Sequence, residues 1–129
     1  MNKRGFTLVE LLVVIAIIAV LAGVVLVAIN PTALLAKGRD ATRLQDIENL
    51  HKGIMLALAD SEVTLSSTSG CTTCTSLSGT RVVDGTGWVK YTVPTGKTGL
   101  SKYLPTLPAD PTNTSASVYT YISDGTNYE

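Results

Sequence analysis

The 129-residue sequence is poor in the residues from which most catalytic and metal sites are built. It has one histidine and two cysteines, too few for a disulfide scaffold or a four-thiolate zinc site. It has no Gly-rich phosphate loop, no Ser/His/Asp arrangement at informative spacing and no pair of carboxylates in a credible pocket segment. The length leaves no room for a multidomain enzyme. We therefore expect neither enzyme activity nor a cofactor.

An excess of charge of one sign is also lacking. Ten Lys and Arg residues balance ten Asp and Glu residues, so the formal net charge is zero. A neutral chain has no electrostatic attraction for nucleic acid or for an anionic surface. We expect no nucleic-acid partner.

Hydrophobic residues, by contrast, are concentrated near the N-terminus. Residues 6–29 hold 21 of the 58 in the chain, and residues 11–29 carry no polar or charged side chain. As a helix, those 19 residues would span about 28 Å, close to the hydrocarbon thickness of a bilayer. Lys3 and Arg4 precede the span, so the positive-inside rule predicts a cytoplasmic N-terminus. A secretory signal peptide is the weaker alternative, because the apolar run is too long and lacks an A-x-A cleavage site.

Glu10 is the one charged residue in this apolar stretch. A charge at the bilayer centre costs on the order of 3 kcal/mol, and less near the interface. One interpretation is a carboxylate at a helix N-terminus, where the helix dipole favours an anion. The other is a specific cationic partner. If the chain were cut after Gly5, the new amino group of Phe6 would lie close to Glu10, and the same amine of a neighbouring subunit would neutralise it better.

Residues 3–12 (KRGFTLVELL) resemble the class III signal of type IV pilins and the related pseudopilins. That signal has a short basic leader ending in Gly, Phe as the first mature residue, Glu as the fifth and then a long apolar helix. Every one of these positions matches. The resemblance is strong over residues 1–30, looser to about residue 60 and only architectural beyond.

This resemblance implies cleavage between Gly5 and Phe6 by a prepilin peptidase, and N-methylation of Phe6. It also implies that Glu10 pairs with the Phe6 amine of a neighbouring subunit while an assembly platform builds a helical filament of identical chains. Cleavage would remove Lys3 and Arg4, which leaves eight basic against ten acidic residues and a side-chain charge of about −2.

The predicted helix changes character near its middle. Gly23 adds flexibility, and Pro31 lacks an N–H and crowds the carbonyl four residues earlier, so we expect a kink there. In the family resembled, this part of the helix can also lose helical order within a filament, and both outcomes remain open. After Pro31, apolar residues recur at helical spacing and form a stripe that must pack on the C-terminal region: Leu44, Ile47, Leu50, Ile54 and Leu58.

The next segment reads as a loop, because residues 61–80 contain 12 Ser or Thr residues. Cys71 and Cys74 lie within it. A redox C-x-x-C would need a helix N-terminus in a thioredoxin-like context, and a zinc site would need two further ligands. Because the predicted topology puts this loop outside the cytoplasm, we expect a short structural disulfide.

Short strands follow. Residues 81–83 and 88–93 are predicted to form a hairpin around the turn at 84–87, with Val89, Tyr91 and Val93 on the face toward the helix. A further strand is predicted over residues 117–123. The expected fold class is α+β, a long N-terminal helix packed on a small antiparallel sheet, as in the pilin fold. Its expected segments are a leader (1–5), a hydrophobic transmembrane and assembly helix (6–30), an amphipathic continuation (31–60) and a Ser/Thr-rich loop with the small sheet (61–129).

Residues 107–111 (LPADP) also look like the C-terminal part of some pilins and major pseudopilins, where Asp110 would be a calcium ligand. Asp124 and loop carbonyls are the other ligands in view, so a turn-forming Asp110 is favoured and no metal site is predicted. Asn113 opens an N-glycosylation triplet, a pattern that often arises by chance. The sequence stops at Glu129 just after a turn, which fits either a minimal edge strand or a further segment.

Together these features predict a major pilin, the structural subunit of a type IV pilus or pilus-like filament, which polymerises through its hydrophobic helix after leader cleavage. The precursor would be a single-pass protein of the cytoplasmic membrane, and the assembled subunit would be extracellular. Two alternatives remain open: a pseudopilin of a type II secretion system, and a minor or tip pilin with a binding role. A single-pass protein that acts as a monomer is disfavoured by Glu10.

Overall fold

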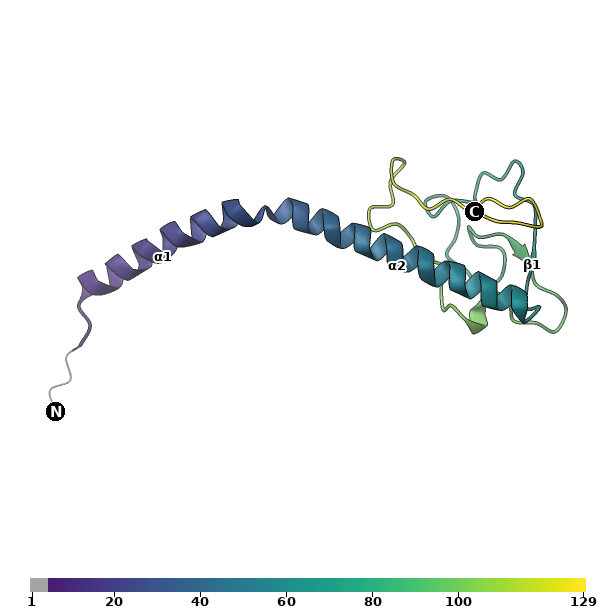
Figure 1. The fold of residues 1–129 in the computed structure, drawn as a ribbon, viewed down its shortest axis with the longest axis horizontal. Coiled ribbons are helices and arrows are strands. Elements are labelled where there is room, and N and C mark those ends of the chain that lie inside the picture. The colour runs from purple at the N-terminus through teal and green to yellow at the C-terminus, as the bar shows by residue number, and fades with distance from the viewer. Residues whose placement is uncertain (1–4) are drawn as a thin grey trace. The chain divides into compact units, whose positions relative to one another are not determined.

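A computed structural model describes residues 5–129 of the chain. The chain divides into two compact units, residues 1–38 and residues 39–129. Lys3 and Arg4 of the predicted leader lie outside the described residues. The elements, labelled in Figure 1, are α1 (Leu8–Ile29), α2 (Pro31–Ala59), β1 (Thr64–Leu65), β2 (Tyr91–Thr92) and the 3₁₀ helix η1 (Gly99–Lys102). Two helices followed by a small antiparallel sheet confirm the predicted α+β class.

Helix α1 begins at an N-terminal capping box formed by Thr7 and Glu10. Thr7 adopts an extended backbone conformation and its hydroxyl accepts a hydrogen bond from the Glu10 amide, while the Glu10 carboxylate accepts one from the Thr7 amide. This reciprocal capping box satisfies two of the amides that a helix start leaves unpaired. The 22 residues that follow are long and apolar enough to cross a membrane.

The two helices meet at a break of one residue. Asn30 has a left-handed backbone (φ 47°), which ends α1 at Ile29. Its side-chain oxygen then accepts hydrogen bonds from the Thr32 hydroxyl and the Ala33 amide, so Asn30 also caps the start of α2. Pro31 occupies the first position of α2, where a missing N–H costs nothing.

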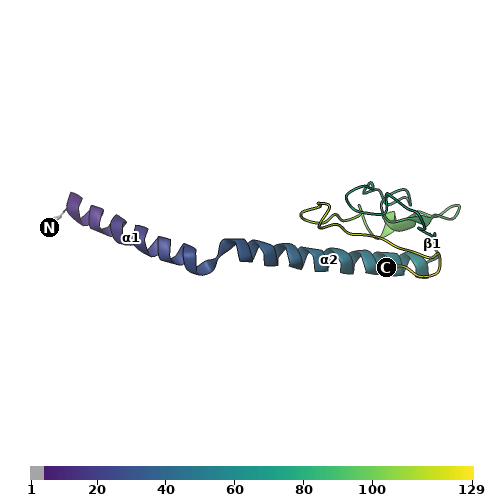
Figure 2. The same cartoon turned by 90° about the horizontal axis from the view of Figure 1, so that it is seen from above.

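The core of residues 39–129 lies between the C-terminal half of α2 and the segments that follow it. Ile54 and Ala57 of α2 are buried, and Gly53 leaves room for Leu104, which a Cβ at residue 53 would approach to 2.8 Å. The other buried members of the core come from the loops and the sheet: Val63, Val83, Trp88, Val89, Tyr91, Leu100, Leu107, Tyr119 and Tyr121. Figure 2 shows the C-terminal segment, in yellow, lying alongside α2, and hydrogen bonds join the two.

The predicted apolar stripe of α2 is therefore covered over only part of its length. Ile54 is buried, and Leu50 and Leu58 are partly buried against the core. Leu44 and Ile47 remain 73% and 53% exposed. The expectation that the whole stripe packs on the C-terminal region is wrong for its first two members, because the later segments contact this part of α2 through Arg43 and Asp46 instead.

The predicted hairpin over residues 81–93 is also wrong. β2 pairs with β1, with Thr64 opposite Thr92 and Leu65 opposite Tyr91. Arg81 is drawn away, because its carbonyl accepts a hydrogen bond from the Leu107 amide and its guanidinium donates to the Leu107 carbonyl. Residues 81–90 form no named strand, although Val89 and Tyr91 are buried and Val93 packs against the core, as predicted for that face.

The predicted alternation of faces fails at Trp88, because the consecutive residues Trp88 and Val89 are both fully buried. The strand predicted over residues 117–123 is likewise not a named strand. It makes isolated antiparallel bridges, among them Thr75 with Thr120 and Ser123 with Tyr128.

Candidate processing and assembly site

The Gly5–Phe6 bond, the predicted cleavage point, lies in non-helical chain just before α1. The Phe6 side chain is 87% exposed, and a Cβ added to Gly5 would meet no atom within 4 Å. A peptidase has to bind its substrate in an open conformation, and here the backbone does not have to be released from a helix first. The geometry therefore permits cleavage at this bond.

Glu10 lies one turn into α1 with its carboxylate held by Thr7. The Thr7 amide and the Thr7 hydroxyl each donate to Oε2 of Glu10 at 2.8 Å. Within residues 5–129, both of these bonds use the same carboxylate oxygen, so Oε1 remains for a second partner. The arrangement explains how a carboxylate is accommodated at the start of an apolar helix, because neutral donors and the helix dipole both favour its charge.

The rest of α1 offers an apolar surface on every side. None of its residues, all of which the structure describes, is buried. Water cannot solvate so much contiguous hydrocarbon without a large penalty, so a bilayer or other protein must cover it. Gly23 lies within this helix without interrupting it, and Pro31 lies just beyond its end.

A second group of polar residues joins the loops that follow α2 to this helix, and Arg43 is its centre. The Arg43 guanidinium donates to Oδ2 of Asp110 from Nε at 2.6 Å and to Oδ1 from Nη2 at 3.2 Å. It also donates to Asp40 from Nη1 at 2.6 Å. The Asp110 side chain is only 3% exposed, so this bidentate pair satisfies a charge that is largely withdrawn from water. The Arg43 guanidinium holds the pKa of Asp110 well below its usual value.

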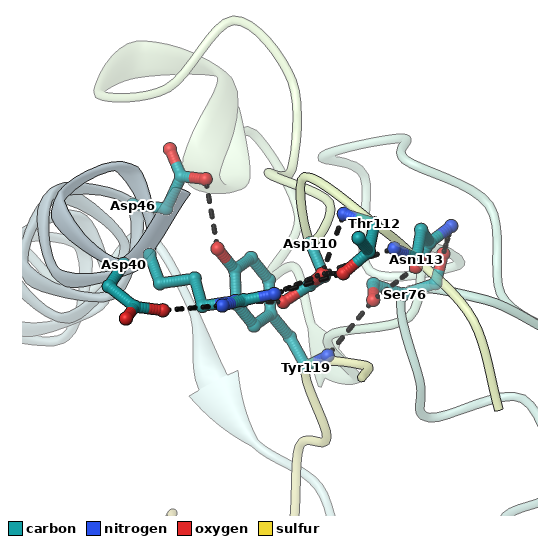
Figure 3. A network of polar contacts seen from close by, with 8 residues as sticks. Asp40, Asp46, Ser76, Asp110, Thr112, Asn113 and Tyr119 are labelled. Carbon is teal, nitrogen blue, oxygen red and sulfur yellow. Dashed lines mark hydrogen bonds and ion pairs between the residues drawn. The ribbon is translucent and has the colours of Figure 1, made fainter. Parts of the chain in front are cut away.

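The network continues beyond Asp110, as Figure 3 shows. The Thr112 and Asn113 amides donate to the Asp110 carboxylate, which makes Asp110 the turn-forming residue of its loop. Asn113 in turn accepts from the Ser76 hydroxyl at 2.8 Å and donates to the Ser76 carbonyl at 3.2 Å. With both ends of its amide occupied, Asn113 is poorly placed to accept a glycan.

Tyr119 supplies a separate link between the C-terminal segment and α2. Its hydroxyl donates to the Asp46 carboxylate at 3.0 Å, and its amide donates to the Ser76 hydroxyl at 3.0 Å. Burial and the neighbouring carboxylate of Asp46 raise the pKa of Tyr119 well above its usual value. Figure 3 shows this hydroxyl and the Asp110 carboxylate approaching the same helix.

Neither Arg43 nor Tyr119 appears among the candidate residues from the sequence. The one available signal is Arg43 itself, a cation just before the first stripe residue, Leu44, with no acidic residue four positions away on its helix. Its main partner is 67 residues distant in sequence, which no local pattern reveals.

The remaining candidate residues lie in the loops. Cys71 and Cys74 are joined by a disulfide in the structure, with their Cα atoms 5.8 Å apart. The Asp124 carboxylate accepts hydrogen bonds from the Thr126 and Asn127 amides, and these bonds lower the pKa of Asp124. Within residues 5–129 no group of three or more His, Cys, Asp or Glu side chains is arranged to hold a metal ion. Asp110 and Asp124 each serve their own turn.

The N-terminal segment is similar to a known family of proteins. Residues 1–26 match the prokaryotic N-terminal methylation motif. This motif is the class III signal peptide of type IV pilins and pseudopilins, which confirms the resemblance seen in residues 3–12. It supports a membrane-anchored precursor of pilin-like or pseudopilin type and implies processing by a prepilin peptidase. No curated protein and no solved structure matches the chain.

Proposed function

We propose that this chain is a structural subunit, a major pilin, of a type IV pilus or pilus-like filament. One observation carries the proposal: the methylation motif, residues 1–26, contains most of a 22-residue apolar helix of which no residue is buried by the described chain. Such a helix is stable in a bilayer, or against other helices of its kind. The bilayer holds the helix before assembly, and a filament of identical subunits surrounds it with other helices afterwards.

The proposed sequence of events uses the geometry at the start of α1. The precursor waits in the membrane with Glu10 held by Thr7. Cleavage after Gly5 gives Phe6 a free α-amino group, and the Phe6 amine of a neighbouring subunit then binds the carboxylate oxygen that Thr7 leaves unused. Because this pair is withdrawn from water in the filament, it fixes the axial register between subunits.

Replacing Glu10 tests this proposal. We expect Glu10→Ala in the full-length chain to insert into the membrane normally while the yield of sheared filaments falls roughly tenfold or more, since one unpaired buried amine costs at least about 1.4 kcal/mol. Glu48→Ala is the matched control, because Glu48 is an exposed carboxylate on α2. Its filament yield should equal that of the wild type. Normal filament yield from Glu10→Ala would contradict the ion pair.

The length of the filaments separates the major pilin from its alternative. Pseudopilins carry the same class of signal, but their filaments are short and push substrates through a secretion system. Electron microscopy of cells that express the chain should show long surface filaments. Short filaments confined to the envelope would support the pseudopilin instead.

A further inference from the structure

The disulfide between Cys71 and Cys74 lies in a loop segment that pairs with the C-terminal part of the chain. Thr75 forms an antiparallel bridge with Thr120, and the Tyr121 amide donates to the Cys74 carbonyl at 2.9 Å. The disulfide therefore comes directly before the residues that make this pairing.

The same two segments meet a second time at Thr68. Its amide donates to the Ser123 carbonyl at 2.9 Å, and its hydroxyl accepts from the Ser123 amide at 2.8 Å. Between this contact and the one at Cys74, the first segment advances six residues while the second advances only two. Four residues are therefore extra on one side, and they form a large bulge in the pairing.

The disulfide closes this bulge covalently. The Cys71 amide donates to the Thr68 carbonyl at 2.9 Å, which shapes the first half of the bulge, and the disulfide shapes the second half. A cross-link removes alternative conformations that the open chain would otherwise sample. The register of a segment this rich in Ser and Thr is weakly specified by its side chains. The disulfide therefore helps to fix which residues of the loop face residues 119–123.

The segment held by this pairing is also the one that contacts α2. The Tyr119 hydroxyl donates to Asp46, and the Tyr128 hydroxyl lies 3.0 Å from Nδ1 of His51 in a hydrogen bond. Figure 3 shows the Tyr119 amide bonded to the Ser76 hydroxyl, and the Ser76 amide donates to the Tyr119 carbonyl in return. A change of register at the disulfide would therefore reach the contacts on α2.

The two cysteines differ in their exposure. Cys74 is 3% exposed, whereas Cys71 is only partly buried, so a thiolate from solvent attacks Sγ of Cys71. That attack breaks the S–S bond, forms a mixed disulfide with Cys71 and releases Cys74 as a thiolate, which takes a proton from water. A second thiol of the same reagent then displaces Cys71. A dithiol is thereby oxidised to its disulfide while both cysteines are reduced.

We propose that the Cys71–Cys74 disulfide is a redox-sensitive lock on the C-terminal segment. While the bond is intact, residues 119–129 stay on α2, and reduction by a dithiol raises the population of a state in which they are detached. The Leu107 amide donates to the Arg81 carbonyl, outside the paired segments, so this part of the core stays folded. Because disulfides persist in oxidising compartments, the lock closes only in a chain whose loop has reached one.

Hydrogen exchange of single amides tests the proposal, measured by NMR on the full-length chain in detergent micelles with and without excess dithiothreitol. Reduction should speed the exchange of the Tyr121 and Ser123 amides roughly twentyfold, the factor that chain entropy gives for a closed ring of four residues. The Leu104 and Leu107 amides, which bond to Leu100 and to Arg81, should exchange at an unchanged rate. Alkylation with iodoacetamide, followed by mass spectrometry, verifies that both thiols are free.

Two variants separate the disulfide from the sequence of its loop. Joint replacement of Cys71→Ser and Cys74→Ser should give the fast exchange at Tyr121 without dithiothreitol and no further response to it. Thr72→Ala is the matched control, because Thr72 lies between the two cysteines and its side chain is exposed. It should keep both the slow exchange of the wild type and its response to dithiothreitol.

Three results would overturn the proposal. The first is a folded wild-type chain whose disulfide excess dithiothreitol does not reduce, and the second is reduction that leaves the Tyr121 and Ser123 amides unchanged. The third is reduction that speeds exchange of the Leu107 amide as much as that of Tyr121, because the disulfide would then support the whole core. None of these results bears on the filament, which the Glu10 variant tests separately.

Discussion

The two units of this chain use apolar side chains in opposite ways. Helix α1 has 22 residues and buries none of them. Residues 39–129 bury Trp88, Val89, Leu100 and Leu107 almost completely. Removal of hydrocarbon from water is favourable wherever it happens. In the second unit, burial of apolar side chains stabilises the fold. In α1 the apolar side chains stay exposed, so they are free to be buried in a bilayer or against other chains. Fold stability and assembly should therefore be separable by substitution.

The largest contrast is expected from the same truncation made once in each unit. Leu107→Ala should lower the free energy of unfolding of the C-terminal unit by about 3 kcal/mol, because Leu107 is fully buried and leaves a cavity. Leu21→Ala, at a residue 60% exposed in α1, should change it by less than about 0.5 kcal/mol. Urea unfolding of the full-length chain in detergent, followed by the emission of its one tryptophan, measures both. Equal losses would mean that α1 belongs to the folded core and would break the comparison.

The second contrast sets a shielded ion pair against an exposed one. Asp110→Asn should lower the thermal midpoint by roughly 10 °C, because it leaves the Arg43 guanidinium without its main counter-charge. Glu48→Gln breaks the exposed pair with Lys52 on the same helix and should leave the midpoint unchanged. A similar midpoint for the two variants would contradict the role given to the Arg43 network.

The same pair predicts a pH dependence. Because Arg43 lowers the pKa of Asp110 below its ordinary 3.8, the pair stabilises the folded state fully at pH values above that figure. This contribution is lost progressively as the pH falls toward the lowered pKa. The thermal midpoint of the wild type should therefore decline between pH 5 and pH 2.5 more steeply than that of Asp110→Asn. Parallel curves for the two proteins would count against the pair.

The smallest contrast lies between two neighbouring tyrosines. Tyr119→Phe removes a hydrogen bond to Asp46 and should cost about 1 kcal/mol of folding stability. The Tyr121 hydroxyl is buried beside Ser123 and makes no hydrogen bond within residues 5–129. Tyr121→Phe should therefore be neutral or slightly stabilising. Urea unfolding distinguishes the two, and a larger loss from Tyr121→Phe would reverse the assignment.

The N-terminal half of the fold was predictable because its determinants are local. A run of apolar residues fixes the position of α1, and Thr7, three residues before Glu10, fixes its start. The motif around Gly5 and Phe6 is likewise contiguous, so a single stretch of sequence reveals it. Here local preference and final structure agree because residues 5–129 bury no residue of this helix in packing that could override its local preference.

The C-terminal half was predictable only as a class, because its contacts join distant segments. Thr64 pairs with Thr92, 28 residues away, whereas the local sequence pattern predicts a hairpin over residues 81–93. The alternation expected around Trp88 failed for the same reason, since buried loops do not follow strand periodicity. Arg43 and Asp110 could each be seen in the sequence, but only the fold brings them together.

The most direct test of the central claim is the mass of the N-terminal peptide of the protein isolated from assembling cells. If α1 is an assembly surface released by processing, the mature chain begins at Phe6 and carries one additional methyl group. Gly5→Leu should retain Met1, because a side chain at residue 5 meets nothing in the fold and so disturbs only recognition by the peptidase. A wild-type protein that still begins at Met1 in its assembled form would contradict the account.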